Sequence, residues 1–333
     1  MKKSIRIGIV GYAKFGQGMA RTFSAIDGIE IAGVFNRGAE RRQQAEADGY
    51  RAFDDYAELL ALPGLDGVAI ATANCVHAEQ CIQAAEAGKH IFCEKPLALD
   101  MESFDRVSEA CRRAGVVTHL DFTMRFGGAQ RKLIELAHGG RLGRTLTLWV
   151  RRCRGYGLWA AGKRHPDIVH PEISGGWNIH HNVHGTDLLL HLAQDRVVEV
   201  YCKQARSAEE VPCEEIILAI VTFAGGAIGY VGDSMSIQRE DYAGIIGDKG
   251  SVVLRHGGEF VIKMENGTET KESVDEEKGL AASCRAFVDA CRGTGNGNIP
   301  FEQGRHSLEV LLAMNQSASE GRIIRLDDGN VQE

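Results

Sequence analysis

Two groups of ionisable side chains in this sequence could move a proton on and off a hydroxyl group. One is the pair Glu94-Lys95, which directly follows an apolar stretch. The other contains His180, His184, Asp187 and His191, which fall on one face of an expected helix. Histidine titrates near neutral pH, and a lysine ammonium can stabilise a developing alkoxide. The two groups therefore predict acid–base chemistry on an alcohol or a carbonyl group.

The elements that would position Lys95 form an α/β alternation over residues 1–123. Apolar, β-branched stretches alternate with helical patterns, which predicts a doubly wound parallel sheet of the Rossmann type. Ligands of such a sheet bind outside the carboxyl ends of the strands, where Lys95 would stand. An isolated Glu-Lys pair would more often be a surface ion pair. The motifs elsewhere in the sequence are what favour a functional role for Glu94-Lys95. The expected strands are Ile5–Val10, Ile29–Phe35, Asp66–Ala71, His90–Cys93 and Val116–Phe122.

A glycine-rich turn opens the chain. It follows the first expected strand and precedes a helical pattern, and it matches the dinucleotide fingerprint Gly-x-Gly-x-x-Gly except that Ala13 takes the second glycine position. The free N–H groups of the helix start would hold a pyrophosphate, with a contact that Ala13 loosens. The expected cofactor contacts of this turn are Gly11, Tyr12, Ala13, Lys14, Phe15 and Gly16.

The second expected strand ends at Asn36-Arg37, where an enzyme specific for NAD would carry an acidic residue. A neutral Asn36 would not repel a 2′-phosphate, and Arg37 can pair with one. Arg41 and Arg42 follow, although they also fit the solvated start of a helix. The expected cofactor is NADP or NAD, with NADP slightly favoured.

The second half, residues 124–333, changes character to an α+β domain. Most of its expected strands are joined by tight glycine turns, which predicts a large, mostly antiparallel open sheet. One broad face of this sheet needs a cover, so burial of that face against another subunit is expected. The expected elements include strands Arg144–Cys153, Val197–Cys202, Glu215–Phe223, Ala227–Asp233, Tyr242–Ile246, Ser251–Arg255, Phe260–Met264 and Ile323–Leu326, and helices Leu280–Arg292 and Glu302–Glu320.

The histidine-bearing helix admits more than one interpretation. A single histidine would more often be a structural residue, but three histidines and an aspartate on one stripe indicate a reactive or metal-binding face. His180 could orient His184, relay its proton or bind a substrate hydroxyl, while His181 should turn away. Candidate substrate contacts are Arg125, Trp177, Asn178 and Asp187, and a loop with Tyr156, Trp159 and Arg164 could grip a polyhydroxylated ligand.

Composition narrows the class of protein. The chain has 333 residues, a net charge of −7 and a pI of about 6.0, so a nucleic-acid partner is not expected. No apolar run approaches the length of a membrane span, and no signal peptide is expected. The nine cysteines are dispersed without a Cys-x-x-Cys pair, which indicates reduced thiols and a cytoplasmic location.

These motifs together resemble the Gfo/Idh/MocA oxidoreductase family, which includes glucose-fructose oxidoreductase and inositol dehydrogenase. The resemblance is carried by the glycine-rich opening, Thr72-Ala73-Asn74 with His77, Glu94-Lys95-Pro96, the Gly-Gly…His184-x-x-Asp187 helix and the closing stretch from Gly304 to Leu326. It implies an NAD(P)-dependent dehydrogenase or reductase acting on a sugar, cyclitol or related polyol. It also implies a homodimer or homotetramer formed through the large sheet of the second half.

The resemblance also assigns roles. Lys95 and His184 correspond to the catalytic lysine and histidine. Glu94 and Lys95 lie on the nicotinamide side, and Thr72, Asn74 and His77 lie along the cofactor. A cis bond is expected between Lys95 and Pro96. His180 stands where many members carry an aspartate, which leaves its role open.

Two alternatives remain at this point. The first is a glycoside hydrolase or lyase assisted by NAD or by a metal, because His180, His184 and Asp187 have the ligand types and spacing for a divalent ion. The second is a non-catalytic, cofactor-sensing protein, against which the Lys95 and His184 pair argues. Metal is not expected for a dehydrogenase of this family.

Overall fold

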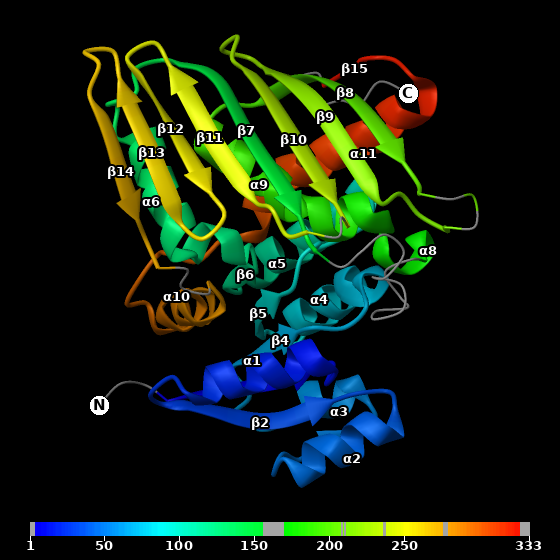
Figure 1. Cartoon of the computed structure of the whole chain (residues 1–333). Coiled ribbons are helices and arrows are strands. Elements are labelled where there is room, and N and C mark those ends of the chain that lie inside the picture. The colour runs from blue at the N-terminus through cyan, green and yellow to red at the C-terminus, as the bar shows by residue number, and fades with distance from the viewer. Residues whose placement is uncertain are drawn as a thin grey trace. The chain divides into compact units, whose positions relative to one another are not determined.

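The computed structural model describes residues 4–155, 170–207, 209, 211–235, 238–275 and 279–326, and the chain divides into two compact units (Figure 1). The first unit is Met1–Thr123 with Gly279–Arg305, and the second is Met124–Lys278 with His306–Glu333. The expected boundary after residue 123 coincides with a break between the units. The expectation that residues 124–333 form a single domain is wrong, because a segment near the C-terminus returns to the first unit.

The first unit contains a six-stranded sheet in the order β3-β2-β1-β4-β5-β6, and every neighbouring pair is parallel. This is the doubly wound arrangement that the α/β alternation predicts. The two-residue strand β3 was not expected. The strands are β1 (Ile5–Val10), β2 (Ile29–Phe35), β3 (Ala52–Phe53), β4 (Gly67–Ile70), β5 (His90–Cys93) and β6 (Thr118–Leu120).

Local signals explain where the helices of this unit begin and end. Asp55 and Asp100 are N-caps whose carboxylates accept hydrogen bonds from Ala57 N–H and Ser103 N–H. Gly115 ends its helix in the left-handed conformation at φ 63°. The helices are α1 (Lys14–Ser24), α2 (Ala39–Ala47), α3 (Tyr56–Leu60), η1 (Asn74–Val76), α4 (His77–Glu86) and α5 (Met101–Ala114).

Helix α10 (Leu280–Arg292) comes from the second half of the chain but packs in the core of the first unit. Its apolar face contains Cys284, Phe287 and Val288, all without exposed surface. The Phe287 ring lies edge-on to Phe23 and Phe92, with ring centroids 6.2 and 5.7 Å away. Burying such a face stabilises the unit by roughly 1.5–3 kcal/mol per large side chain, so the segment returns. The short helix η5 (Phe301–Gly304) follows.

The second unit contains a nine-stranded sheet in the order β14-β13-β12-β11-β7-β10-β9-β8-β15. The β7–β10 pair is parallel and the other pairs are antiparallel, as a mostly antiparallel sheet requires. Strand β14 was not expected, because its five residues are all exposed and charged or polar. The strands are β7 (Thr145–Cys153), β8 (Val197–Ala205), β9 (Ile216–Phe223), β10 (Ile228–Ser234), β11 (Tyr242–Gly247), β12 (Gly250–Arg255), β13 (Glu259–Met264), β14 (Glu269–Ser273) and β15 (Ile324–Arg325).

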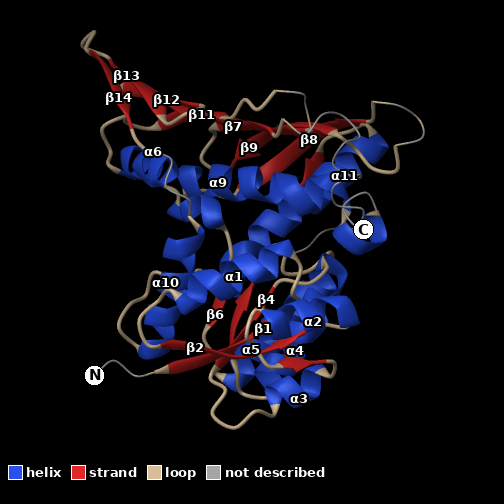
Figure 2. Cartoon of the chain, turned by 60° about the horizontal axis from the view of Figure 1, so that its bottom comes forward, coloured by secondary structure: helices blue, strands red, loops and turns tan. Residues whose placement is uncertain are grey.

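Helices of the second unit lie against one face of this sheet, and no described helix of the unit covers its other face (Figure 2). The bounds are η2 (Thr123–Phe126), α6 (Gly128–His138), α8 (Pro171–Ser174), η4 (Asn178–Asn182), α9 (Val183–Ala193) and α11 (Arg305–Glu320). None of the helices that the structure describes has the length and apolar character to cross a membrane. All nine cysteines are free thiols, as the sequence predicts.

Candidate functional site

The glycine-rich turn between β1 and α1 has the geometry that a dinucleotide pyrophosphate needs. Gly11 has φ +92°, and a Cβ there would lie 2.6 Å from the Ala71 carbonyl oxygen. A Cβ on Gly16 would lie 2.0 Å from the Gly11 oxygen, so both positions require glycine. Ala13 has φ −73°, which any residue adopts. The first turn of α1 has no acidic side chain and no side-chain cap, so it fits an anionic group.

Tyr12 contributes to this turn through its backbone. Its side chain is 1% exposed, and its hydroxyl donates to Asp48 at 2.8 Å. Burial, followed by the hydrogen bond to Asp48, raises the pKa of the Tyr12 hydroxyl. The Tyr12 N–H donates to Asn36 Oδ1 at 3.0 Å, which uses the Asn36 side chain to hold the turn. Direct contact between the Tyr12 ring and a cofactor is therefore not supported, whereas Lys14 and Phe15 are exposed at the helix start.

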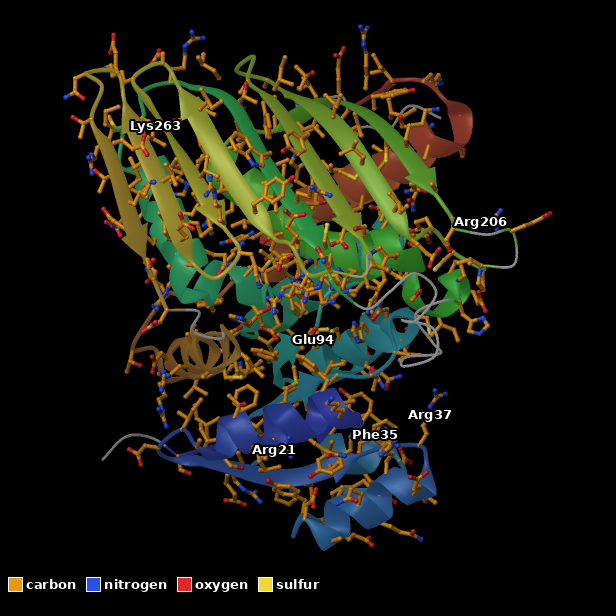
Figure 3. All side chains as sticks on the ribbon, viewed as in Figure 1. Arg21, Phe35, Arg37, Glu94, Arg206 and Lys263 are labelled. Atoms are coloured by element: carbon orange, nitrogen blue, oxygen red, sulfur yellow. The ribbon has the colours of Figure 1, made fainter. Side chains whose placement is uncertain are left out.

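Arg37 is exposed after β2, and its side chain extends away from the ribbon (Figure 3). Arg42, by contrast, is turned back onto the chain. Its guanidinium donates to the backbone oxygens of Asn36 and Arg37 at 2.9 and 2.6 Å. Arg42 thus shapes the end of β2, and Arg37 is the arginine of this turn that is accessible to a ligand.

His77 holds two strand ends together. Its ring is fully buried, with Nδ1 2.8 Å from the Pro96 oxygen and Nε2 3.2 Å from the Thr72 oxygen. Burial lowers the pKa of His77, although the two carbonyl contacts oppose this shift. The expectation that His77 contacts the cofactor directly is therefore not supported. Thr72 is half-buried and donates to Gln80 at 2.6 Å, and Asn74 is buried.

Glu94 and Lys95 follow β5, and the expected cis bond between Lys95 and Pro96 is confirmed. Lys95 is 8% exposed. The Glu94 carboxyl group lies against that of Asp121, which follows β6 and is fully buried. Burial, and then the charge of Asp121, raises the pKa of Glu94. Two carboxyl groups and one ammonium therefore gather at this end of the sheet.

In the second unit, the histidine-bearing segment begins as a π-helical turn, η4, and continues as α9. The sequence predicts a single α-helix here, so the π turn is a difference, of a kind that occurs often at functional sites. Residues 176–189 are all described, and among them only His180 and His184 are not buried. The two histidines therefore form the accessible stripe of this segment.

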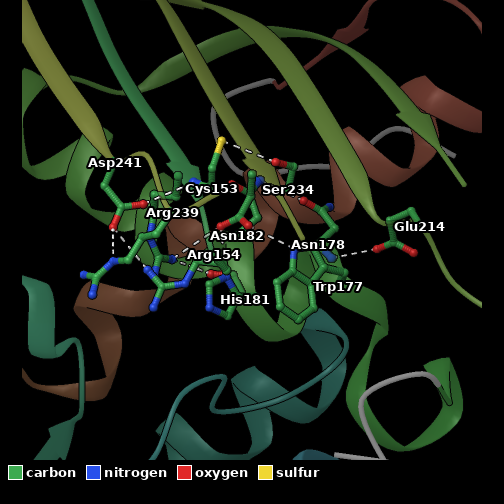
Figure 4. Close-up of polar contacts among 12 residues, drawn as sticks. Cys153, Arg154, Trp177, Asn178, His181, Asn182, Glu214, Ser234, Arg239 and Asp241 are labelled. Carbon is green, nitrogen blue, oxygen red and sulfur yellow. Dashed lines mark hydrogen bonds and ion pairs between the residues drawn. The ribbon is translucent and has the colours of Figure 1, made fainter. Parts of the chain in front are cut away.

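His181 is directed into the packing beside that stripe, as the sequence predicts. Its ring stacks on Trp177 with centroids 4.3 Å apart, and its Nδ1 lies 2.9 Å from Asp233 Oδ2 (Figure 4). The Trp177 indole N–H donates to the other oxygen of Asp233 at 2.9 Å, and Arg152 donates to the His181 carbonyl oxygen. Trp177 has no exposed surface, so its expected contact with substrate is not supported.

Asn178 is also a packing residue. It has no exposed surface, and its side-chain amide donates to the Leu311 carbonyl oxygen at 2.9 Å and to Asn315 at 2.8 Å. Its N–H donates to Glu214 at 2.6 Å, in the contact drawn in Figure 4. Burial raises the pKa of Glu214. The expected substrate contact by Asn178 is thus replaced by a role in anchoring the start of the π turn.

Arg125 and Asp187 pair with each other. The guanidinium donates to both carboxylate oxygens, at 2.8 and 2.6 Å, and the side chains are 10% and 1% exposed. Ser307 adds a hydrogen bond to Asp187 at 3.3 Å. Burial, followed by the charge of Arg125, lowers the pKa of His191 to about 4. Direct substrate contact by Arg125 or Asp187 is not supported, and neither is a metal-ligand role for Asp187.

Four contributors to these networks were not singled out from the sequence: His119, Asp121, Asp233 and Ser283. His119 and Asp121 lie in the expected strand Val116–Phe122, where they alternate with apolar residues. That alternation is the one sequence feature that could have indicated a buried polar role for them. Asp233 and Ser283 have partners more than fifty residues away, at His181 and Asp121. The loop with Tyr156, Trp159 and Arg164 lies outside the described residues.

Comparisons with known proteins agree with these features. A family model described as an oxidoreductase family with an NAD-binding Rossmann fold matches residues 5–122. A model of the GFO/IDH/MocA C-terminal domain matches residues 130–253. Among curated proteins, the chain is 27% identical to 1,5-anhydro-D-fructose reductase of Ensifer adhaerens, over 91% of this chain and 92% of that protein.

Two further relatives cover almost the whole chain. Myo-inositol 2-dehydrogenase of Thermotoga maritima is 23% identical over 97% of this chain and 99% of its own length. Among solved structures, GenD2 from gentamicin A biosynthesis, in complex with NAD, superposes with a TM-score of 0.86 and 20% identity, covering 98% of both chains. The structural likeness extends through both units and concerns the fold.

The buried ion pair leads to the first prediction. Replacing Asp187 by Asn keeps the side-chain shape but leaves the Arg125 charge buried without its carboxylate. We expect the free energy of unfolding to fall by about 3–5 kcal/mol, measured by urea denaturation. The matched control is Glu199→Gln, which removes the exposed ion pair with Arg325 and should cost no more than about 1 kcal/mol. A stable Asp187→Asn variant that only raises KM would restore Asp187 as a substrate contact.

Proposed function

Since this chain belongs to the Gfo/Idh/MocA oxidoreductase family, we propose that it transfers a hydride between NADP or NAD and a secondary hydroxyl or carbonyl group of a sugar, cyclitol or related polyol. The observation that carries the proposal is the row of residues after β1, β4 and β5. These residues bring a turn that suits a dinucleotide phosphate and the Glu94-Lys95 pair to one edge of a parallel sheet.

The side chains divide the chemistry between them. When bound, the nicotinamide ring supplies the hydride acceptor or donor. Lys95 Nζ holds the reacting oxygen of the substrate and stabilises the charge that develops on it. His184 takes the hydroxyl proton as the alcohol is oxidised and returns it in the reverse direction. Its Nδ1 is buried, so we assign the proton transfer to Nε2. His180, on the same accessible stripe, orients His184 or binds a further hydroxyl group.

The substrate class rests on the relatives and on the polar character of the stripe. Two relatives are named as a reductase of 1,5-anhydro-D-fructose and a dehydrogenase of myo-inositol, and both compounds are rings that carry several hydroxyl groups. Two adjacent imidazoles suit such a substrate, since each nitrogen can donate or accept a hydrogen bond. A screen of sugars and cyclitols with NAD and NADP in parallel, followed by nicotinamide absorbance, tests the proposal, and no turnover with any of them would contradict it.

The cofactor preference is proposed to be NADP. Asn36 brings no negative charge to the end of β2, and its side chain is used by the Tyr12 N–H. Arg37 is accessible there and can pair with a 2′-phosphate. GenD2, which shares this fold, was solved in complex with NAD, so the fold alone does not favour NADP and the proposed preference rests on the local charge at Arg37.

We also propose a homodimer or homotetramer formed through the large sheet. Strand β9 carries apolar residues on both of its faces. On the face that no described helix of the unit covers, Leu218 and Ile220 are each 52% exposed. Ile220 lies opposite Tyr230 of β10, whose ring stacks on Trp149 of β7. A solvated sheet face would carry polar residues, so this apolar row fits a second copy of the chain.

The nine free thiols support a reducing, cytoplasmic compartment.

The cofactor proposal predicts an asymmetric effect of one substitution. Replacing Arg37 by Ala should weaken the binding of NADP about tenfold or more and leave NAD nearly unchanged, because a charge-assisted pair with the phosphate contributes roughly 1.5–3 kcal/mol. Fluorescence titration with each cofactor measures both constants. Arg41→Ala, an exposed arginine on α2, is the control. An equal loss for both cofactors would contradict the assignment.

The accessible stripe predicts which histidine carries the proton. His184→Ala should lower kcat by about 10²- to 10⁴-fold with little change in cofactor affinity. His180→Asp should keep much of the activity with a shifted pH profile if His180 orients His184, or raise KM if it binds substrate. His181→Gln should lose stability rather than kcat, because the His181 contacts are with Asp233 and Trp177. A folded His181→Gln variant as inactive as His184→Ala would reverse this assignment.

The sheet face predicts a change in assembly. Replacing Leu218 and Ile220 together by Glu places charges at the centre of the proposed interface, and sedimentation velocity should then detect monomers. Ala87→Glu, an exposed position in the first unit, introduces a similar charge elsewhere and should leave the oligomer intact. A wild-type chain that already sediments as a monomer at micromolar concentration would rule out the interface.

A further inference from the structure

A row of buried, hydrogen-bonded side chains in the first unit runs from His119 through Ser283 to Asp121, which lies beside Glu94. Cys93 and Leu120, the last residues of β5 and β6, are register partners, and the Asp121 N–H donates to the Cys93 oxygen at 2.9 Å. Glu94 and Asp121 are the next residues along each strand. Because equivalent residues of neighbouring parallel strands point to the same face, the two carboxyl groups meet.

The hydrogen bonds of this row all run in one direction, from donor to acceptor toward Asp121. The Ile299 N–H donates to His119 Nδ1 at 3.2 Å, so the ring proton must be on Nε2 if His119 is neutral. His119 Nε2 lies 2.8 Å from Ser283 Oγ and therefore donates to it. The Ser283 hydroxyl, having accepted, donates its own proton to Asp121 Oδ1 at 2.5 Å. Each donor in turn presents a hydrogen atom toward Asp121, which stabilises a carboxylate there.

One donor is missing if both carboxyl groups are ionised. Among the described residues, none donates to Glu94 Oε1 or to Asp121 Oδ2, and both oxygens are buried. Two buried carboxylates in contact would also repel each other. A single proton held between them satisfies both requirements, since it turns the contact into a hydrogen bond and removes one of the two charges.

The hydrogen bond from Ser283 to Asp121 and the pKa shifts of the two carboxyl groups both favour Glu94 as the holder of that proton. Burial, and next the charge of Asp121 and the hydrogen bond to it, raises the pKa of Glu94. Burial also raises the pKa of Asp121, but the hydrogen bonds from Glu94 and Ser283 oppose the rise. Glu94 is thus the neutral acid and the donor, and Asp121 is the anion and the acceptor.

Among the described residues, Lys95 is the charged group next to the Glu94 and Asp121 carboxyl groups. Lys95 acts on Glu94 and on Asp121 and favours the anionic form of both. The thiols of Cys93 and Cys284 also face the pair, and burial raises the pKa of both, so they are neutral. The net charge of Glu94, Lys95 and Asp121 is then zero, in an environment where burial would make an excess charge costly.

We propose that Asp121 is a positioning residue which, held by Ser283 and His119, keeps one proton on Glu94 and supplies the single negative charge that balances Lys95. The importance of this charge for catalysis rests on the proposed role of Lys95. An ammonium loses its proton readily when it is buried, and one nearby anion favours the protonated form. A second anion would add repulsion between the two carboxylates without a second cation to offset it.

Infrared spectroscopy tests the shared proton directly. The wild-type protein at pH 7 should show a C=O stretching band of a buried neutral carboxylic acid that is absent from Glu94→Gln. Asp121→Asn should remove the same band, because Glu94 then loses the neighbouring charge that keeps it protonated. Glu86→Gln, an exposed glutamate of the same unit, is the control and should leave the band unchanged. A band that is missing from the wild type, or that survives Glu94→Gln, would overturn the proposal.

Stability provides a second readout that needs no activity. An acid whose pKa is raised by folding contributes less to stability as the pH rises above its ordinary value, here 4.5 for Glu94. The melting temperature of Glu94→Gln minus that of the wild type should therefore increase from pH 5 to pH 8. A difference that stays constant over this range would contradict a shared proton, and this comparison remains possible if Asp121→Asn fails to fold.

Kinetics then link the pair to Lys95. Each single variant keeps one anion, on Asp121 or on Glu94, whereas Glu94→Gln combined with Asp121→Asn keeps none. We expect the alkaline limb of the kcat/KM profile to move down by about one pH unit or more in the double variant and less in either single variant. Equal shifts in all three variants would contradict the charge balance. If the protein oxidises no polyol, the infrared and melting results still decide the proton's position, so the two failures are distinguishable.

Discussion

The parallel register of β1, β4, β5 and β6 is the constraint on which the first unit depends. Val10 pairs with Ile70, Ile70 with Cys93, and Cys93 with Leu120, so the four strands end in one row. The residue after each strand then donates its N–H to the neighbouring strand end, as Ala71 does to Val10 and Glu94 to Ile70. This row brings the glycine turn, Glu94-Lys95 and Asp121 to one edge. A slip of one residue would turn Glu94 away from Asp121.

Buried charges of the second unit are paired in a way that leaves two histidines accessible. Arg125 neutralises Asp187, and Asp233 accepts hydrogen bonds from Trp177 and His181. Breaking such pairs is costly because the remaining charge stays buried, so these groups are not available to a ligand without a large loss of stability. The accessible surface of residues 176–189 is therefore small and consists of the imidazoles of His180 and His184.

The return of residues 279–305 to the first unit joins packing and chemistry. Phe287 contributes to the aromatic cluster with Phe23 and Phe92, which anchors α10. The same helix carries Ser283, and Ile299 follows it, so the donors that stabilise the Asp121 carboxylate arrive with the segment. The hydrophobic effect thus brings the segment to the sheet, and the hydrogen bonds fix its orientation there.

The sequence by itself determined the parallel sheet, the glycine turn and the cis peptide before Pro96, because these depend on local periodicity and short motifs. It could not assign Arg125, Trp177, Asn178 and Asp187, which it interpreted as substrate contacts. Ionisable and aromatic residues look alike in a sequence whether they face a ligand or a partner more than fifty residues away. The tertiary structure alone decided which charges neutralise one another, and it did so because burial makes an unpaired charge or donor costly.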